Sequence, residues 1–454
     1  MRRKVVVLLQ ATFILVLVSL FIAGLRRGRQ GFNLEASSIK SSFYGWSHSS
    51  QPNRTIRANA TYTRRPPTAE LKHPNETLLD AATAYVDAIL APDDVTFPRL
   101  DCPVPTGDRY EHLRVEDHRS SAQDLKKTLK YFFALDLHQC ANLLPRLLGS
   151  ILEAIEFLGP EHCSLSIVEG RSDDGTFEIL LQLREELSRL GVKYFLQTNE
   201  LNPMADGDKN IKVRIEGLSE LRNQALQPLI DLHLEADTDV TVVFLNDVAI
   251  CMEDILELIY QRRRQNADMT CAMDWTYVGP DPTFYDVWIA RGMNGDSFFN
   301  IPPDGSWDSA WHLFWNNPEA LEKLNAGKPF QVFSCWNGAV TFTAKPVVQQ
   351  KLRFRSSVAQ ECPQGEPKSF CKDLWLLGYG KIAVVPSVNL EYNDEGGEKI
   401  KSAKGYVSRF VGGGDENDKI EWQEKPPEKV KCIPKYENQY WRPWDEKGLN
   451  ITAS

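Results

Sequence analysis

The chain has 454 residues, enough for a large buried core and for more than one domain on length alone. Hydrophobic residues make up 42% and charged residues 25%, a composition that excludes an intrinsically disordered chain. The net charge is −9, and the excess of Lys and Arg is confined to the N-terminal region, so the globular part is acidic and a nucleic-acid partner is disfavoured.

The N-terminal residues predict a membrane anchor behind a short cytosolic tail, residues 1–4. Residues 5–24 carry no charged side chain, and a helix of this length spans about 30 Å, the thickness of the hydrocarbon core of a bilayer. A cleaved signal peptide is the competing interpretation, but its apolar region is shorter, roughly 7–15 residues. We therefore expect an uncleaved anchor.

Residues 25–75 are rich in Ser, Arg, Pro and Asn, which is typical of a solvated stem. Four Asn-x-Thr sequons follow the anchor and favour a lumenal body with a cytosolic N-terminus. These expected glycosylation sites are Asn53, Asn59, Asn75 and Asn450.

All nine cysteines lie beyond the expected anchor, so disulfides are permitted there. No Cys-x-x-Cys spacing indicates structural zinc. The odd count leaves at least one thiol unpaired within a monomer, and the spacing assigns no pairing.

From residue 76 the apolar periodicity predicts alternating helices and strands. A helix over 76–91 comes first, and strands then alternate with helices that end at Gly or polar residues. The expected strands cover 129–137, 163–170, 192–198, 241–245 and 267–275, and the expected helices cover 142–159, 177–191, 216–236 and 252–265. This series predicts an α/β fold, a Rossmann-like, mostly parallel sheet with helices on both faces.

Polar side chains end several of these strands. Ligands of open parallel sheets bind beyond the carboxyl ends of the strands, so we expect these groups to converge on one edge. They are Asp136, residues 169–174, Asn246, Asp247 and Asp274.

The periodicity is lost after residue 275. Residues 274–317 are dense in Trp, Phe, Tyr, Gly, Pro and Asp, which predicts a substrate-facing wall. Residues 393–419 are rich in Gly, Lys and acidic residues and are expected to be mobile.

Several familiar enzyme motifs are absent. The chain has no Gly-rich dinucleotide fingerprint, no P-loop, no Gly-x-Ser-x-Gly and no His-Glu-x-x-His. Carboxylates at strand ends remain, and hard oxygen ligands suit Mg²⁺ or Mn²⁺ bridged to a phosphorylated ligand.

An ordered set of motifs resembles the fungal α-1,3-mannosyltransferases of the cryptococcal capsule type, GT-A glycosyltransferases of family 69. VEGRSDDGT (168–176) resembles the turn that meets the sugar nucleotide, and SELRNQAL (219–226) resembles the helix that faces its diphosphate. FLNDVAI (244–250) occupies the place of the Asp-x-Asp metal motif. The further motifs are CAMDW (271–275), FYDVWIARGMNG (284–295), FSCWNGAV (333–340) and CKDLW (371–375).

The resemblance covers residues 80–395 and implies a GT-A catalytic domain over 76–395, with a C-terminal extension over 396–454. It implies a type II Golgi membrane enzyme that transfers mannose from GDP-mannose to a mannose-containing glycan, forming an α-1,3 linkage with retention. Mn²⁺ or Mg²⁺ would bridge Asp247 to the donor diphosphate. Asn246 stands near the place of a usual aspartate, which weakens the expected metal site. No His follows His312, so Asp373 is the expected substitute for a late His ligand.

The resemblance also supplies the remaining site candidates. Asp286, then Asp274, are the expected carboxylates near the anomeric carbon, and Arg291 accompanies them. The expected donor-binding residues are Glu169, Asp173, Asp174, Arg222, Asn223, Asn246, Trp288, Trp336 and Asn337.

Each candidate has a structural alternative. Asp247 could cap the helix at 252, and Arg222 could pair with a surface acid. Asp173 and Asp174 could be turn residues. Asp286 could pair with Arg291. The two Trp side chains could belong to the core.

Two rival functions remain open at this point. The missing first aspartate of the metal motif, which here has the sequence Leu245-Asn246-Asp247, permits a catalytically weak scaffold for another transferase. The aromatic stretch permits a lumenal glycan-binding protein. The acceptor and the oligomeric state stay open.

Overall fold

A mixed sheet of ten strands forms the centre of the computed structural model, which describes residues 71–115, 129–203, 211–234, 238–411 and 419–446. The described strands run in the order β3-β2-β1-β4-β9-β5-β10-β8-β7, and β6 pairs with β5. Their bounds are β1 Tyr131–Leu137, β2 Cys163–Glu169, β3 Lys193–Thr198, β4 Thr241–Leu245, β5 Met269–Tyr277, β6 Pro282–Phe284, β7 Arg291–Gly292, β8 Phe330–Ser334, β9 Ala339–Thr343 and β10 Ile382–Leu390.

The first half of this sheet is parallel. β1 pairs in parallel with β2 on one side and with β4 on the other, and β2 pairs in parallel with β3. This arrangement, with the order 3-2-1-4, confirms the predicted α/β class and the short βαβ connections.

The second half departs from the expected simple series. β9 inserts between β4 and β5 and is antiparallel to both, while β5 and β10 are parallel to each other. The sequence pattern did not predict β9, because a run such as AVTFT, buried along its whole length, shows no alternation.

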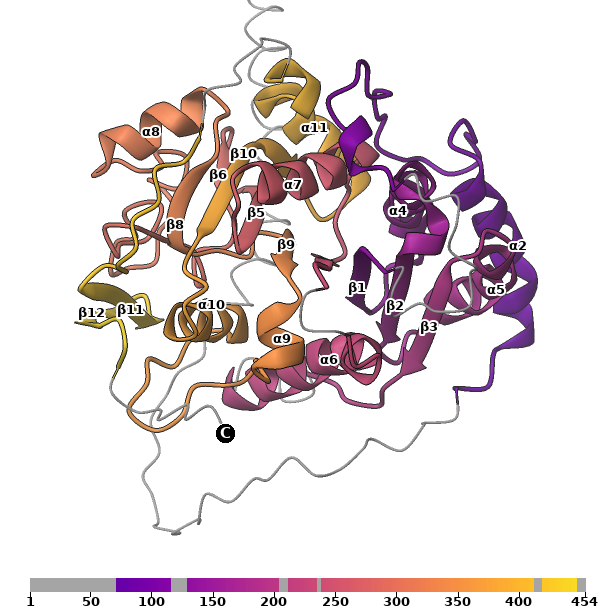
Figure 1. Ribbon diagram of the computed structural model, residues 1–454, viewed down its shortest axis with the longest axis horizontal. Helices are drawn as coiled ribbons and strands as arrows, with labels where there is room; N and C mark the ends of the chain where they lie inside the picture. The colour runs from indigo at the N-terminus through magenta and orange to yellow at the C-terminus, as the bar shows by residue number, and fades with distance from the viewer. Residues whose placement is uncertain (1–70, 116–128, 204–210, 235–237, 412–418, 447–454) are drawn as a thin grey trace, which may run out of the picture. The chain divides into compact units, whose positions relative to one another are not determined.

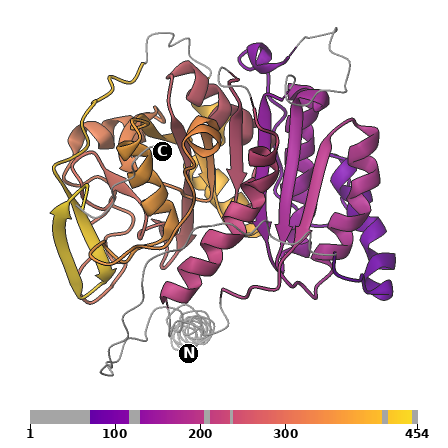
Figure 2. The same ribbon diagram turned by 60° about the horizontal axis from the view of Figure 1, so that its bottom comes forward.

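Helices cover both faces of the sheet, as predicted (Figure 1 and Figure 2). Alternate β1 side chains point to opposite faces: Phe133 and Leu135 join one core with the first set of helices, and Phe132 and Ala134 join the other core. The first set comprises α2 Glu76–Leu90, α4 Leu144–Leu158, α5 Thr176–Arg189 and α7 Met252–Arg264. The second core includes residues of α6 Ile211–Asp231, α8 Pro318–Asn325, α9 Lys345–Gln349 and α10 Glu366–Leu376.

The aromatic stretch after β5 packs mostly inward. Phe284, Phe298 and Phe314 are buried, with successive ring centroids 5.1 and 4.5 Å apart. The expected substrate-facing wall is therefore wrong for most of its aromatic residues, which form part of the second hydrophobic core.

The C-terminal segment is also more ordered than predicted. This segment contains α11 Asp394–Lys404, which is capped by the Asn393 side chain. Lys401 of α11 forms a buried ion pair with Asp254 of α7 at 2.6 Å. A hairpin of β11 Lys429–Lys435 and β12 Asn438–Pro443 follows. The expectation of mobility is therefore wrong for α11, and residues 412–418 lie outside the described residues.

Three disulfides pair six of the cysteines: Cys102–Cys251, Cys271–Cys335 and Cys362–Cys432. Cys140, Cys163 and Cys371 are free and buried. The prediction that disulfides are permitted and that at least one thiol stays unpaired is confirmed.

Apart from Ile211, the described residues belong to one compact unit, Thr63–Pro203 and Lys212–Ser454. α2 begins at Glu76, where the catalytic domain was expected to start. None of the helices in the described ranges is long and apolar enough to span a bilayer, and the expected anchor at 5–24 lies outside these ranges, as does most of the stem. Asn75 is exposed and caps α2, and the other three sequons lie outside the described residues.

Candidate active site

Charged side chains meet beyond the carboxyl ends of β1 and β4, as the strand-end rule predicted. Asp136 is the penultimate residue of β1, and Asn246 and Asp247 follow β4 directly. Asp247 lies close enough to raise the pKa of Asp136 through charge repulsion. The predicted convergence is therefore confirmed for these two carboxylates.

Arg222 of α6 supplies the central positive charge. Its side chain is 8% exposed, and its Nη1 lies 2.8 Å from Glu366 Oε1, with Nε 4.0 Å from Asp136 Oδ2. Neither Nε nor Nη1 has an acceptor in hydrogen-bond geometry among the described residues. Nη1 is nevertheless ion-paired with Glu366, whereas Nε is 4.0 Å from Asp136, and a buried guanidinium of this kind is suited to bind the oxygens of an anionic ligand.

The indole ring of Trp336 packs against this guanidinium. The Arg222 Cζ atom lies 4.6 Å from the ring centroid, and the indole N–H donates to Asn246 Oδ1 at 3.0 Å. Trp336 is 2% exposed, so it holds Arg222 and does not present a face to a sugar. Asn246 thus serves the site by fixing the indole.

Burial raises the pKa values of both strand-end carboxylates. The pKa of Asp136 rises to about 7 through burial, opposed by Arg222 and reinforced by Asp247 and Glu366. The pKa of Asp247 also rises through burial, with Arg222 and His138 opposing the rise. Carboxylates held this way gain from a nearby cation, because a positive charge favours their ionised form.

A second carboxylate pair consists of Asp274 of β5 and Asp286, which follows β6. Asp274 is fully buried and accepts a hydrogen bond from the Tyr392 hydroxyl at 2.7 Å, and Asp286 accepts one from the Asn337 backbone N–H at 3.0 Å. Burial raises the pKa of Asp274 well above its ordinary value, and the charge of Asp286 adds to this rise. Burial also raises the pKa of Asp286 to about 6, while the Asn337 N–H and Arg222 oppose the rise.

Asn337 and Gly338 make the turn that holds Asp286. Both have positive φ angles, 54° and 80°. The Asn337 amide donates to the Ala272 carbonyl at 2.7 Å, so this side chain fixes the turn to β5.

The turn after β2 is built by its own acidic residues. Glu169 accepts from the Ser172 N–H at 2.7 Å, and its other oxygen has no partner among the described residues. Asp174 accepts from the Thr176 N–H and from Ala141, which ties α5 to the end of β1. Asp173 is exposed and accepts from Gln139. Asp174 is therefore a turn residue, and Asp173 is the better placed of the two for a ligand.

Three predicted site residues have structural partners instead. Arg291 is fully buried and donates to the carbonyls of Lys431, Val287 and Ala290, and within the described residues it forms no ion pair with Asp286. The Asn223 side-chain amide donates to the Phe354 carbonyl and accepts from the Phe354 N–H, both at 2.9 Å. Trp288 stacks on Tyr436 with ring centroids 4.9 Å apart.

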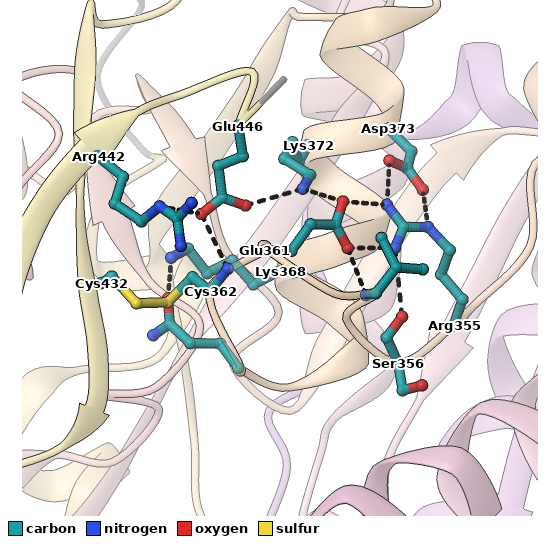
Figure 3. Close-up of polar contacts among 12 residues, drawn as sticks. Arg355, Ser356, Glu361, Cys362, Lys368, Lys372, Asp373, Cys432, Arg442 and Glu446 are labelled. Carbon is teal, nitrogen blue, oxygen red and sulfur yellow. Dashed lines mark hydrogen bonds and ion pairs between the residues drawn. A yellow bond between two sulfur atoms is a disulfide. The ribbon is translucent and has the colours of Figure 1, made fainter. Parts of the chain in front are cut away.

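Asp373 lies in a separate ion-pair network on α10 (Figure 3). Both of its carboxylate oxygens accept from Arg355, at 2.7 and 2.9 Å. The network continues through Glu361 and Lys372 to Glu446, with Lys372 Nζ 3.0 Å from the Glu446 carboxylate. Glu366, two turns earlier on α10, is the residue of this helix that reaches Arg222.

A hollow beside this network is lined by Lys368, Ser369, Lys372, Trp444 and Glu446, among others. Lys372 pairs with Glu361 and Glu446, and Lys368 donates to Gln364. Since these polar groups serve one another, we do not assign the donor site there.

The sequence interpretation missed three residues near the site. Glu366 follows Gly365 and precedes Pro367, a pattern typical of a helix start. Tyr392 follows β10, so the strand-end rule would have found it had that strand been predicted. His138 follows β1 and acts on the Asp247 charge.

A mixed sheet covered by helices on both faces, with an arginine and carboxylates near the ends of its parallel strands, defines the class, an α/β protein whose candidate site lies at that edge of the sheet. Residues 130–373 match the family model described as Cryptococcal mannosyltransferase 1. The chain is 37% identical over 323 residues to the alpha-1,3-mannosyltransferase CMT1 of Cryptococcus neoformans, covering 67% of this chain and 68% of the relative. The chain therefore belongs to the cryptococcal mannosyltransferase 1 family and is a glycosyltransferase.

Solved structures show weaker likeness. A mannosyltransferase from Pyrobaculum calidifontis in complex with GDP-Man and Mn²⁺ is 12% identical, with a TM-score of 0.34 over 70% of this chain and 68% of that one. S. aureus TarS 1-349 is also 12% identical, with a TM-score of 0.33 over 58% of this chain and 60% of that one. Structural similarity this weak does not establish a shared fold or function, so the fold class rests on the sheet topology itself.

Proposed function

We propose that this chain transfers mannose from GDP-mannose to a mannose-containing glycan, forming an α-1,3 linkage with retention at the anomeric carbon. The family membership and the α-1,3-mannosyltransferase name of the 37% identical relative support the linkage and the sugar. The observation that carries the proposal is the buried Arg222, held on Trp336 between Glu366 and Asp136 and facing the strand-end carboxylates.

Arg222 binds the donor diphosphate in this proposal. Its fork matches paired phosphate oxygens, and two of its N–H groups lack acceptors in hydrogen-bond geometry among the described residues. Trp336 and Asn246 keep the guanidinium in place before the donor arrives, so little ordering is needed on binding.

The carboxylates of the site fit a divalent ion. Asp136, Asp247, Asp286 and Glu366 surround one arginine, so an incoming diphosphate meets excess negative charge. No three His, Cys, Asp or Glu side chains gather as a complete metal site within the described ranges, but Mg²⁺ and Mn²⁺ sites often use one or two carboxylates plus phosphate oxygens. Asp247 and Asp136 would hold Mn²⁺ or Mg²⁺ here, and the bound ion would supply charge that stabilises the leaving diphosphate.

Asp286 is the carboxylate we place nearest the reacting carbon. Its ionised form stabilises an oxocarbenium-like transition state by charge. The acceptor hydroxyl oxygen bonds to the anomeric carbon and the bond from that carbon to the diphosphate breaks. The electron pair leaves with GDP, which also takes the hydroxyl proton.

We further propose a Golgi membrane location, with a single-pass type II topology and a lumenal catalytic domain. The apolar residues 5–24 and the sequons support this proposal, and three disulfides are compatible with an oxidising compartment.

The test is a transfer assay with the full chain in detergent, GDP-mannose, Mn²⁺ and α-mannoside acceptors, followed by linkage analysis of the product. We expect an α-1,3-mannoside, loss of product with a chelator, and restoration by Mn²⁺. Asp247→Asn should lower transfer by about 10²-fold or more. Asp80→Asn, at an exposed position on α2, should not change it.

Three results would overturn the proposal in different ways. Unchanged transfer by Asp247→Asn would exclude the metal assignment. GDP-mannose binding without any transfer would favour a scaffold. Glycan binding that ignores the nucleotide would favour a lectin-like protein.

A further inference from the structure

Tyr285 is an exposed aromatic side chain among buried neighbours. It is 41% exposed, whereas Phe284 before it is fully buried and Val287 is 3% exposed. Its position is fixed at both ends, because its N–H donates to the Asp274 carbonyl at 3.1 Å and its carbonyl accepts from the Val287 N–H at 2.8 Å. An exposed tyrosine alone is ordinary, so its surroundings decide its role.

The ring of Tyr285 rests on a second tyrosine. Its centroid lies 4.9 Å from that of Tyr392, with an interplanar angle of 54°. Tyr392 is itself held, because its hydroxyl donates to Asp274 Oδ2 at 2.7 Å. This support keeps the Tyr285 ring in one orientation before any ligand binds, which lowers the entropy lost on binding.

Tyr285 lies beside the second carboxylate pair. Asp286 follows it directly in the chain, and the Tyr285 backbone N–H donates to the Asp274 carbonyl. Its ring partner Tyr392 donates to the Asp274 carboxylate, so the two tyrosines lie next to the carboxylates described above.

The order of the strands separates this pair from the proposed diphosphate site. Asp136 lies at the end of β1 and Asp247 follows β4. β9 separates β4 from β5, and Asp274 of β5 lies with Tyr285 at the other end of the site. With the diphosphate on the β1–β4 side at Arg222, Asp286 lies in between, and the β5 side is left for the sugar that receives the transferred residue.

We propose that Tyr285, backed by Tyr392, is the acceptor subsite of this enzyme and stacks on the C–H face of an α-mannoside. Pyranosides present such faces to aromatic rings, and the phenol hydroxyl can hydrogen-bond a sugar hydroxyl. The inference rests on the proposed function and adds to it the residue that recognises the acceptor.

The experiment compares Tyr285→Ala, Tyr285→Phe and Tyr440→Ala in the full chain. Tyr440 lies on β12, is 36% exposed, and serves as the matched surface tyrosine. We measure the KM for methyl α-mannoside and, separately, the Kd for GDP-mannose with Mn²⁺. Tyr285→Ala should raise the acceptor KM about tenfold and leave the GDP-mannose Kd within about twofold. Tyr285→Phe should keep the stacking and recover most of the affinity.

An unchanged acceptor KM in Tyr285→Ala would overturn the subsite, whereas failure of the wild type to bind GDP-mannose would overturn the proposed function. If the wild type does not transfer, saturation-transfer NMR with methyl α-mannoside replaces the KM. Signal lost in Tyr285→Ala and kept in Tyr440→Ala supports the subsite, and equal signal in both overturns it. Thermal unfolding of each variant checks that the fold is retained.

Discussion

Arg222 is the residue on which several parts of the site depend. Glu366, Asp136 and Trp336 all lie around its guanidinium, and each comes from a different element. A substitution here therefore tests ligand binding and stability together, and the two effects separate by the choice of side chain.

Arg222→Lys keeps the charge but loses the planar fork and its stacking on the indole. We expect kcat/KM for GDP-mannose to fall by about 10²-fold in the transfer assay, with a small loss of thermal stability. Arg222→Met should also lower the unfolding free energy by about 3–5 kcal/mol, because Glu366 and Asp136 lose a buried counter-charge. Arg189→Lys, at an exposed position on α5, is the control, and an equal loss there would contradict this role.

Asp286 predicts a pH dependence. Its pKa of about 6 means that the carboxyl is protonated below this pH and loses the charge that stabilises the transition state. We therefore expect kcat/KM to rise between pH 5 and 7. Asp136, with a pKa of about 7, titrates in the same window, so log kcat/KM of the wild type should fall with a slope of about two below pH 6, and that of Asp286→Asn with a slope of about one. An unchanged slope in this variant would assign the titration elsewhere.

The contact between α7 and α11 decides how the C-terminal segment joins the body. Lys401 of α11 is 1% exposed and pairs with Asp254 of α7, whose carboxylate also accepts the Cys251 N–H at the start of α7. One carboxylate thus caps one helix and anchors another.

Lys401→Met should lower the unfolding free energy by about 3–5 kcal/mol in urea titrations, because Asp254 is left as an unpaired buried charge. Adding Asp254→Asn should recover part of this loss, since a neutral amide oxygen can still accept the Cys251 N–H. Lys399→Met, which breaks an exposed pair with Glu395, should change stability by less than about 0.5 kcal/mol. No recovery in the double variant would mean that packing, and not charge, holds α11.

At the scale of the whole molecule, the disulfides join distant parts of the chain. Cys362–Cys432 ties the β11–β12 hairpin to the start of α10 across 70 residues, and Cys102–Cys251 spans 149 residues. Such links stabilise mainly by restricting the unfolded chain.

The paired variant Cys362→Ser/Cys432→Ser should lose about 4 kcal/mol of unfolding free energy, the value expected for a loop of this length. Its Tm should therefore fall, measured by calorimetry. A reductant should lower the Tm of the wild type by more than that of the variant. Equal shifts in both proteins would show that this disulfide contributes little.

The strand-end rule located the first half of the site from the sequence. Apolar runs of clear length, closed by Gly or polar residues, determined β1–β5 and the helices between them, and parallel pairing then brought Asp136 and Asp247 together. Motif resemblance added Arg222 and Asp286 as site candidates, and it also suggested the family. The comparisons with known proteins confirm the family.

Only the tertiary structure decided the partners of each polar side chain. The sequence suggested Asp373 as a metal ligand and Arg291 as a catalytic residue. Instead, Arg355 binds Asp373 and backbone carbonyls bind Arg291, because a buried charge must be compensated by whatever groups the fold brings near. Glu366 and Tyr392 come from beyond residue 350, at the start of α10 and after β10. The apolar residues of this helix and this strand show no periodicity from which the elements could have been predicted. Local pattern determines elements, since periodicity follows from backbone geometry, whereas long-range packing decides which charges meet.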